Sequence, residues 1–157
     1  CHFAPVFNGL VPPHYKETES EVLGVPASAS KVNPEIDADL GRYKGILKEE
    51  AHIYKHSFKT TTVRNVELTA PYMHNGVFQT LEEVVDFYDN GGGIGLELDV
   101  PNQTLPSSPL GLTDLEKKQL VLFMISLTDT TGMAVKPERL PVFSENKLND
   151  RIIGGTY

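Results

Sequence analysis

The stretch from Thr60 to Gly93 constrains this chain most, because a loop signal and a helix signal follow each other within it. Its first part, T-A-P-Y-M-H-N-G at residues 69–76, combines a proline with an Asn-Gly pair, which is typical of a structured loop. Its second part begins a helix at Thr80, since Glu83 stands three residues further on, at the spacing of a capping box. The stretch also concentrates polar and aromatic side chains, which makes it the first place to look for a functional site.

The helix expected after Thr80 has one apolar side. Four residues follow at helical spacing, namely Leu81, Val84, Val85 and Tyr88. Asn90 and Gly91 then end the helix. Tyr88 is therefore predicted to point inward, where its phenol oxygen needs either a backbone carbonyl or a metal as a partner.

A second helix is predicted over residues 113–127, where Thr113 and Glu116 repeat the capping-box spacing. Its predicted apolar stripe is Leu120, Phe123, Met124 and Leu127. Residues 44–56 are expected to form a short helix and residues 58–68 an extended segment. Prolines and glycines indicate loops over residues 1–33 and 96–112. The last segment, from residue 130 onward, is expected to pack as extended chain.

The first two residues, Cys1 and His2, match the end of a C-x-x-C-H haem-attachment motif. Covalent attachment of haem c needs cysteine thioethers and an axial imidazole, which these two side chains supply. As an isolated dipeptide the pair has little specificity, so the interpretation depends on the rest of the chain.

Composition excludes several other classes of protein. The net charge is -7 without a block of lysine and arginine, which argues against nucleic-acid binding. No apolar run is long enough to span a membrane. A single cysteine excludes an internal disulfide and a cysteine-rich zinc site. The length of 157 residues corresponds to about one domain.

One alternative metal site has the right spacing. On a helix, His52 and His56 would share one face, with Glu49 as a possible third ligand. The position after His52 is Ile53, so the glutamate of a zinc-protease motif is missing. A polar, solvated face is therefore the favoured interpretation of these histidines.

Several separated motifs resemble the bacterial di-haem cytochrome c peroxidases, including the MauG group. The matching pieces are C-H at 1–2, L-G-R-Y at 40–43, F-K-T-T-T-V-R-N-V at 58–66, L-T-A-P-Y-M-H-N-G at 68–76, L-E-E-V-V-D-F-Y at 81–88 and L-G-L-T at 110–113. They follow the order of the family and cover most of residues 1–130. The family often has proline where Thr61 stands.

The resemblance implies a mainly α, cytochrome c-like domain with long loops over residues 1–130, and an extended tail over 131–157 packing on it. The domain resembles the second, electron-transfer domain of the family. The helix before the haem motif and the first cysteine of that motif would then lie outside this sequence. The domain that binds and splits hydrogen peroxide would also lie outside it, so this part alone is expected to be inactive.

The resemblance also implies site residues. Cys1 would form a thioether and His2 would be the proximal ligand of haem c. The distal ligand would be Tyr88, as in the MauG group, with Met73 as the alternative. Lys59 and Arg64 would pair with haem propionates. His74 and Tyr72 would support the region between the haems as buried hydrogen-bonding groups.

A calcium ion between the domains would take the backbone carbonyls of Thr69 and Pro71, because carbonyl oxygens suit this hard cation. The partners would be the peroxidatic haem domain, and a small cytochrome or copper protein as electron donor or a protein substrate. A homodimer is compatible with the family, and the location would be periplasmic. The alternatives are a non-enzymatic c-type electron carrier and a haem-free interaction domain.

Overall fold

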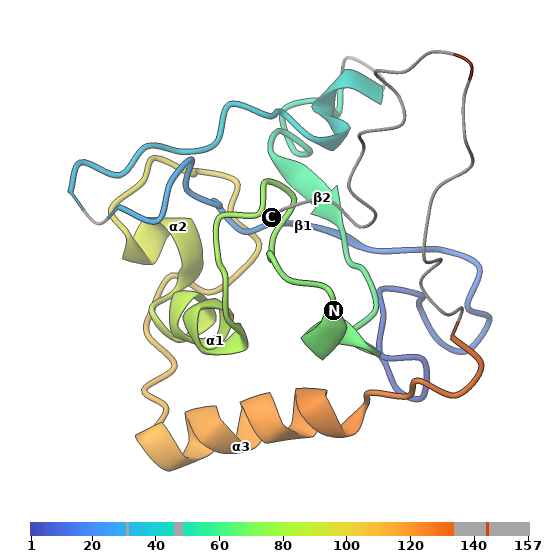
Figure 1. The fold of residues 1–157 in the computed structure, drawn as a ribbon. Helices are drawn as coiled ribbons and strands as arrows, with labels where there is room; N and C mark the ends of the chain where they lie inside the picture. Colours follow the sequence, from blue (N-terminus) through green and yellow to red (C-terminus); the bar gives the residue numbers. More distant parts are fainter. Residues whose placement is uncertain (31, 46–48, 134–143, 145–157) are drawn as a thin grey trace.

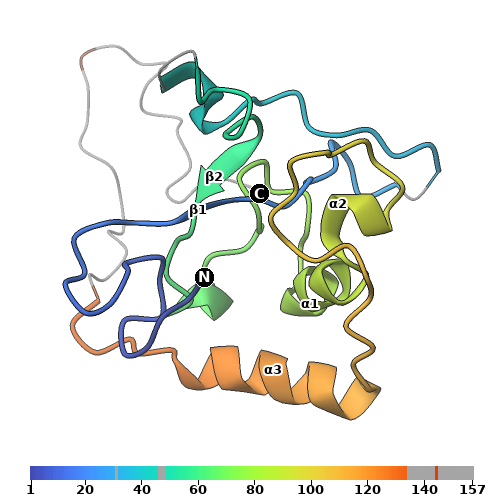
Figure 2. The same cartoon turned by 180° about the vertical axis from the view of Figure 1, so that it is seen from behind.

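The computed structural model describes residues 1–30, 32–45, 49–133 and 144. Within these residues the elements are strand β1 (Ser20–Val22), 3-10 helix η1 (Arg42–Gly45), strand β2 (Ser57–Lys59), 3-10 helix η2 (Val66–Leu68), and helices α1 (Leu81–Asp89), α2 (Gly92–Gly95) and α3 (Asp114–Ser126). Helix α3 runs along one edge of the molecule, and α1 and α2 lie near its beginning (Figures 1 and 2). Long loops join these elements, as the sequence predicted.

Both predicted capping boxes are formed. At the start of α1 the backbone amide of Glu83 donates to Thr80 Oγ1 at 3.2 Å, and the amide of Thr80 donates to Glu83 Oε2 at 3.0 Å. Thr113 and Glu116 make the same pair of bonds at the start of α3, at 3.3 and 2.8 Å. The helix starts are therefore determined by local sequence.

Helix α1 buries the predicted side and contributes to two hydrophobic clusters. One cluster consists of Leu81, Val85 and Val121 and joins α1 to α3. The other consists of Val25, Phe78 and Phe87, with half-buried Tyr88 and Met73 packed against it. A third cluster, of Val22, Leu98 and Val100, lies beside strand β1.

Helix α3 faces its neighbours with a different stripe from the predicted one. Leu120 and Phe123 are 43% and 46% exposed, whereas Val121 is 6% exposed. The prediction for Leu120 and Phe123 was wrong because α3 packs on α1 through Val121, which contacts Leu81 and Val85. Lys117 Nζ on the same helix lies 2.8 Å from Asp86 Oδ1 and 2.7 Å from Asp89 Oδ2 on α1. Met124 packs against the α1–α3 cluster, as expected of a core residue.

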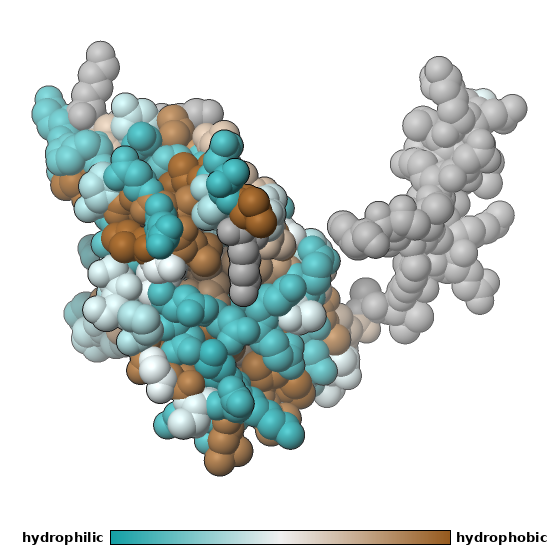
Figure 3. Space-filling model, turned by 90° about the vertical axis from the view of Figure 1, so that its left-hand side faces the viewer, coloured by the Kyte–Doolittle hydropathy of each residue, from teal (hydrophilic) through white to brown (hydrophobic). Residues whose placement is uncertain are grey.

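Exposed apolar side chains remain on other sides of α3. Leu115 and Leu122 are both exposed, and apolar groups reach the surface at several places on the face shown in Figure 3. No helix within the described part of the chain is long and apolar enough to cross a membrane.

The short helix predicted over residues 44–56 is not formed. The chain has η1 and then turns over 49–56, with residues 46–48 outside the described ranges. A distant side chain explains the difference, because Asn102 Nδ2 donates to the carbonyls of Ile53 and Lys55 at 3.0 and 2.9 Å. The extended segment predicted over 58–68 is formed only in part, as strand β2, before η2 begins.

Strand β1 lies in a segment predicted to be loop. It pairs antiparallel with β2, with Glu21 opposite Phe58 and Val22 opposite Ser57. A three-residue strand is too short to show an alternating pattern, so it could not be predicted. The predicted tail over 131–157 lies almost entirely outside the described residues.

Candidate functional site

The N-terminal loop, residues 1–11, begins with Cys1 and His2 near the middle of the molecule (Figures 1 and 2). The loop is closed by the amide of Phe3, which donates to the carbonyl of Asn8 at 2.9 Å. His2 is exposed as a residue, yet desolvation of its ring lowers the pKa of its imidazole, while hydrogen bonding to the backbone of Phe7 raises it. A lowered pKa favours the neutral imidazole, which is the form that binds metals.

Arg64 supports this loop from the segment after β2. Its Nη2 donates to the carbonyl of Pro5 at 2.7 Å, and its guanidinium lies 5.4 Å from the centre of the Phe7 ring. The Phe7 ring in turn meets Phe123 of α3 edge to face at 5.6 Å. Arg64 thus holds the loop that carries Cys1 and His2 next to the end of α3.

Two carboxylates lie beside the cysteine. The Sγ of Cys1 and carboxylate oxygens of Glu19 and Glu21 all lie within 4.8 Å of one another. Sequence reasoning missed both glutamates, because backbone pairing brings them to the chain start: the amide of Glu19 donates to the carbonyl of Gly9 at 2.8 Å, and Leu10 forms an antiparallel bridge with Thr18.

Tyr88 lies on the side of α1 that packs against the cluster of Val25, Phe78 and Phe87, and its ring meets the Phe87 ring edge to face at 5.9 Å. Burial, with a smaller contribution from the negative charge of Glu21, raises the pKa of the Tyr88 phenol to about 12.

The Tyr88 hydroxyl forms no hydrogen bond with any of the described residues. Tyr72 provides the contrast, because its hydroxyl donates to the carbonyl of Val66 at 3.2 Å. Tyr88 is half-buried and its hydroxyl is not among the buried side-chain atoms that lack a partner, so the hydroxyl reaches the surface and is accessible to an added group. The prediction that Tyr88 points inward is confirmed, and a backbone carbonyl is not its partner in the described part of the chain.

Met73, the alternative distal ligand, packs against the same hydrophobic cluster as Tyr88. Its backbone is left-handed, with φ of 69°, an uncommon conformation for a residue other than glycine. The structure therefore brings both candidate ligands to one cluster, on the helix and on the 69–76 loop.

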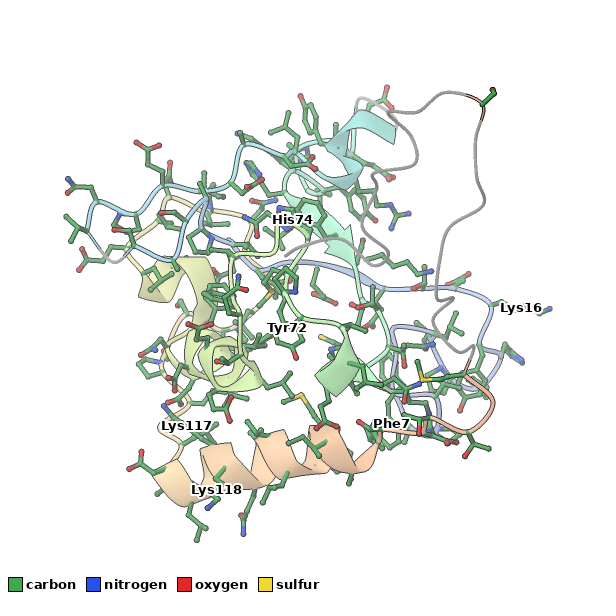
Figure 4. All side chains as sticks on the ribbon, in the orientation of Figure 1. Phe7, Lys16, Tyr72, His74, Lys117 and Lys118 are labelled. Carbon is green, nitrogen blue, oxygen red and sulfur yellow. The ribbon has the colours of Figure 1, made fainter. Side chains whose placement is uncertain are left out.

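The 69–76 loop is fixed by polar contacts with residues far away in sequence. His74 Nε2 lies 3.2 Å from Asp37 Oδ1, and Asn75 Nδ2 donates to Asp37 Oδ2 at 2.9 Å. The amide of Asn75 is the main reason why the pKa of Asp37 is lowered. The His74 ring stacks on Phe58 of β2 at 3.6 Å, and Figure 4 shows His74 and Tyr72 near the centre of the molecule. Sequence reasoning did not find Asp37, which lies in an unremarkable loop.

The two carbonyls expected to bind calcium lie at the start of this loop. Thr69 follows η2 and is exposed, whereas Pro71 is half-buried. Neither carbonyl accepts a backbone or side-chain hydrogen bond within the ranges that the structure describes, so both oxygens are available to a cation. The structure is compatible with the expected donor set.

Lys59 belongs to a different feature from Arg64. It lines a shallow groove of about 440 Å³ beside the β1–β2 ribbon, together with Arg42, Ser57 and Phe58, and Arg64 does not line this groove. The Oγ of Ser57 is buried without a hydrogen-bond partner in the described structure.

The alternative metal site at His52 and His56 is not formed. Both residues lie in turns instead of on one helical face, and His56 Nδ1 lies 2.8 Å from the carbonyl oxygen of Asp39. Among the described residues they join no group of three possible metal ligands. The zinc-type spacing was therefore a coincidence of sequence.

No model of a protein family matches the chain. Over 99 residues it is 46% identical to the cytochrome-c peroxidase IdrP2 of Denitromonas iodatirespirans, covering 63% of this chain and 24% of that protein. Over 100 residues it is 32% identical to the methylamine utilization protein MauG of Methylorubrum extorquens, covering 64% and 27%. A solved structure of a MauG-like protein associated with microbial copper homeostasis has a TM-score of 0.48 at 26% identity, covering 70% of this chain and 34% of that chain.

These similarities support a relationship of the chain to the di-haem cytochrome c peroxidases and MauG proteins. The matches span about a quarter of the length of these relatives.

Proposed function

We propose that this chain is the electron-transfer haem domain, of cytochrome c-like fold, of a di-haem cytochrome c peroxidase or a MauG-like oxidase. The whole protein would reduce hydrogen peroxide to water or oxidise a protein substrate. The observation that supports this proposal is the phenol of Tyr88, which is half-buried, without a hydrogen-bond partner in the described structure, and packed with Met73 against one hydrophobic cluster. When bound, haem c supplies a one-electron redox centre.

Cys1 and His2 would hold the haem, by a thioether from the sulfur and by the neutral imidazole as the proximal ligand. The lowered pKa of His2 keeps its ring unprotonated near neutral pH. Arg64 would keep the loop in place through the carbonyl of Pro5, so its role in this proposal is to position the loop, in addition to the propionate contact expected for it and for Lys59.

Tyr88 is the favoured distal ligand, and Met73 is the alternative. The raised pKa means that the Tyr88 phenol keeps its proton at neutral pH unless a positive charge compensates the phenolate. A hard, anionic phenolate favours the ferric state, whereas a soft thioether favours the ferrous state. Tyr88 would therefore suit a domain that stores oxidising equivalents, and Met73 a domain that accepts electrons from a donor protein.

A calcium ion and a redox partner are the other components of the proposed function. The carbonyls of Thr69 and Pro71 would hold calcium at the border with a peroxidatic haem domain. A small cytochrome or copper protein, or a protein substrate, would be the redox partner in the periplasm, and a homodimer is compatible with this arrangement.

The test is to record visible and EPR spectra of the haem-loaded protein with Tyr88→Phe and Met73→Leu. We expect a ferric low-spin signal, without the long-wavelength band of methionine–iron ligation, that is lost in Tyr88→Phe and kept in Met73→Leu. A signal that survives Tyr88→Phe and is lost in Met73→Leu would assign the distal position to Met73. A wild-type protein that takes up no haem at all would refute the proposed function.

A further inference from the structure

We propose that Glu21 sets the redox balance of the site, as a fixed negative charge beside Cys1. This inference rests on the proposed function, because it assigns a residue to the site where the haem would be held. Glu21 would bind neither the iron nor the substrate. It would act through space, on the charge of the redox centre and on the Tyr88 phenol.

The pairing of strands β1 and β2 determines to which face the Glu21 side chain points. Successive residues of a strand point to opposite faces, so Glu21 points away from the face of Val22, which is 1% exposed in its own core cluster. Residues directly opposite in an antiparallel pair share a face, so Glu21 shares its face with Phe58. The Phe58 ring stacks on His74, which places this face of the ribbon against the 69–76 loop.

The carboxylate ends beside the proposed haem attachment. A Glu21 carboxylate oxygen lies within 4.8 Å of Cys1 Sγ, so a group attached to this sulfur would lie next to the Glu21 charge.

Glu21 itself has no ionic partner among the described residues; the Cys1 ammonium group beside it lies 3.7 Å from Glu19 Oε2. The half-buried Glu21 side chain forms neither an ion pair nor a hydrogen bond with the described residues. The nearest carboxylate, that of Glu19, has the same sign. Lys59 and Arg42 lie on the other face of the β1–β2 strand pair, the face of Ser20. Lys59 stands opposite Ser20 in the strand register, and Arg42 Nη1 donates to Ser20 Oγ at 3.0 Å.

An uncompensated negative charge stabilises the more positive, oxidised state of a neighbouring redox centre, and low dielectric surroundings strengthen the effect. Glu21 would therefore lower the midpoint potential of the haem and favour the ferric form. A phenolate ligand would also lower the midpoint potential, so Glu21 and Tyr88 would act together.

The experiment is a spectroelectrochemical titration of the haem-loaded full-length protein, comparing wild type with Glu21→Gln, Glu21→Asp and a matched control. For Glu21→Gln we expect the ratio of ferric to ferrous haem at a fixed potential to fall about tenfold, which is 59 mV for a one-electron couple. Glu21→Asp keeps the charge and should stay close to wild type. The control is Glu17→Gln, which removes one exposed charge from the same segment and should leave the ratio unchanged.

The outcomes separate this inference from the proposed function. If the ferric-to-ferrous ratio is unchanged in Glu21→Gln, or changes equally in Glu17→Gln, the role of Glu21 is overturned. The proposed function still stands in that case, provided that wild type shows its haem spectra. Absence of haem in wild type overturns the proposed function instead. If circular dichroism shows that Glu21→Gln does not fold, Glu21→Thr provides the same neutral test with a residue favoured in strands.

Discussion

Tyr72 and Tyr88 show how one residue type takes two roles in this chain. Both pack against the cluster of Val25, Phe78 and Phe87, but only the Tyr72 hydroxyl has a protein acceptor, the carbonyl of Val66. Tyr72 therefore fixes the 69–76 loop to η2, whereas the Tyr88 hydroxyl is left for another group.

This difference predicts the stability of two matched variants of the haem-free protein. Tyr72→Phe should lower the free energy of unfolding by about 1 kcal/mol, because it removes a hydrogen bond. Tyr88→Phe should change it little at neutral pH, since no hydrogen bond is lost. Urea unfolding followed by circular dichroism measures both, and a larger loss in Tyr88→Phe than in Tyr72→Phe would contradict the assignment of their hydroxyls.

The raised pKa of Tyr88 predicts a loss of stability in alkali for the haem-free protein. The folded-state pKa of about 12 exceeds the unfolded value of about 10, so the neutral phenol contributes stability below about pH 10 that is lost as pH rises toward 12. Unfolding free energies measured from about pH 8 to about pH 11 should fall more steeply in wild type than in Tyr88→Phe. Parallel curves would show that Tyr88 ionises as freely as an exposed tyrosine.

At the scale of elements, the two capping boxes are local devices and should respond locally. Thr80→Ala should lower the free energy of unfolding by about 1 kcal/mol, because the amide of Glu83 loses its acceptor at the start of α1. Thr80→Ser keeps a hydroxyl and should lose less than half of that amount. Thermal unfolding of the three proteins tests this, and an alanine variant as stable as wild type would show that the cap contributes nothing.

The junction of α1 and α3 depends on a buried carboxylate. Asp89 Oδ1 accepts from the amide of Leu112 at 3.0 Å, and its other oxygen faces Lys117, whose hydrogen bond is the main reason why the pKa of Asp89 is lowered. Because the pKa of Asp89 is lower in the folded than in the unfolded chain, its ionised carboxylate contributes stability above the unfolded-state pKa, near pH 4. That stability is lost as the pH falls through the folded-state pKa. The melting temperature of wild type should therefore fall more on acidification below about pH 4 than that of Asp89→Asn. A variant that falls as steeply as wild type would contradict the role of Asp89.

These elements also show which parts of the structure were predictable. The starts of α1 and α3 were predictable, because Thr80 and Thr113 contact residues only three positions away. The rotation of α3 was not, because Val121 packs against Leu81 and Val85 of another helix. The inward direction of Tyr88 followed from helical spacing, but Glu21 reaches the site only through strand pairing, which a three-residue strand does not reveal.

At the scale of the whole molecule, the proposal predicts that this chain alone does not turn over hydrogen peroxide. The matches cover about a quarter of the related peroxidases, and the peroxide-splitting haem would belong to a domain outside the chain. Peroxide consumption by the haem-loaded chain of 157 residues should equal that of a denatured control. Robust turnover would place the peroxide-binding centre within this domain.

The contact of Val22 with Thr104 has a consequence for the order of events during synthesis. The amide of Val22 donates to Thr104 Oγ1, and the amide of Thr104 donates back to the carbonyl of Val22, both at 3.0 Å, across more than half the chain. Contacts so distant in sequence form late, since the intervening chain must be ordered first. A chain made from its N-terminus therefore presents the segment with Cys1 and His2 before its partners exist. An enzyme that modifies this segment would meet it as an open peptide.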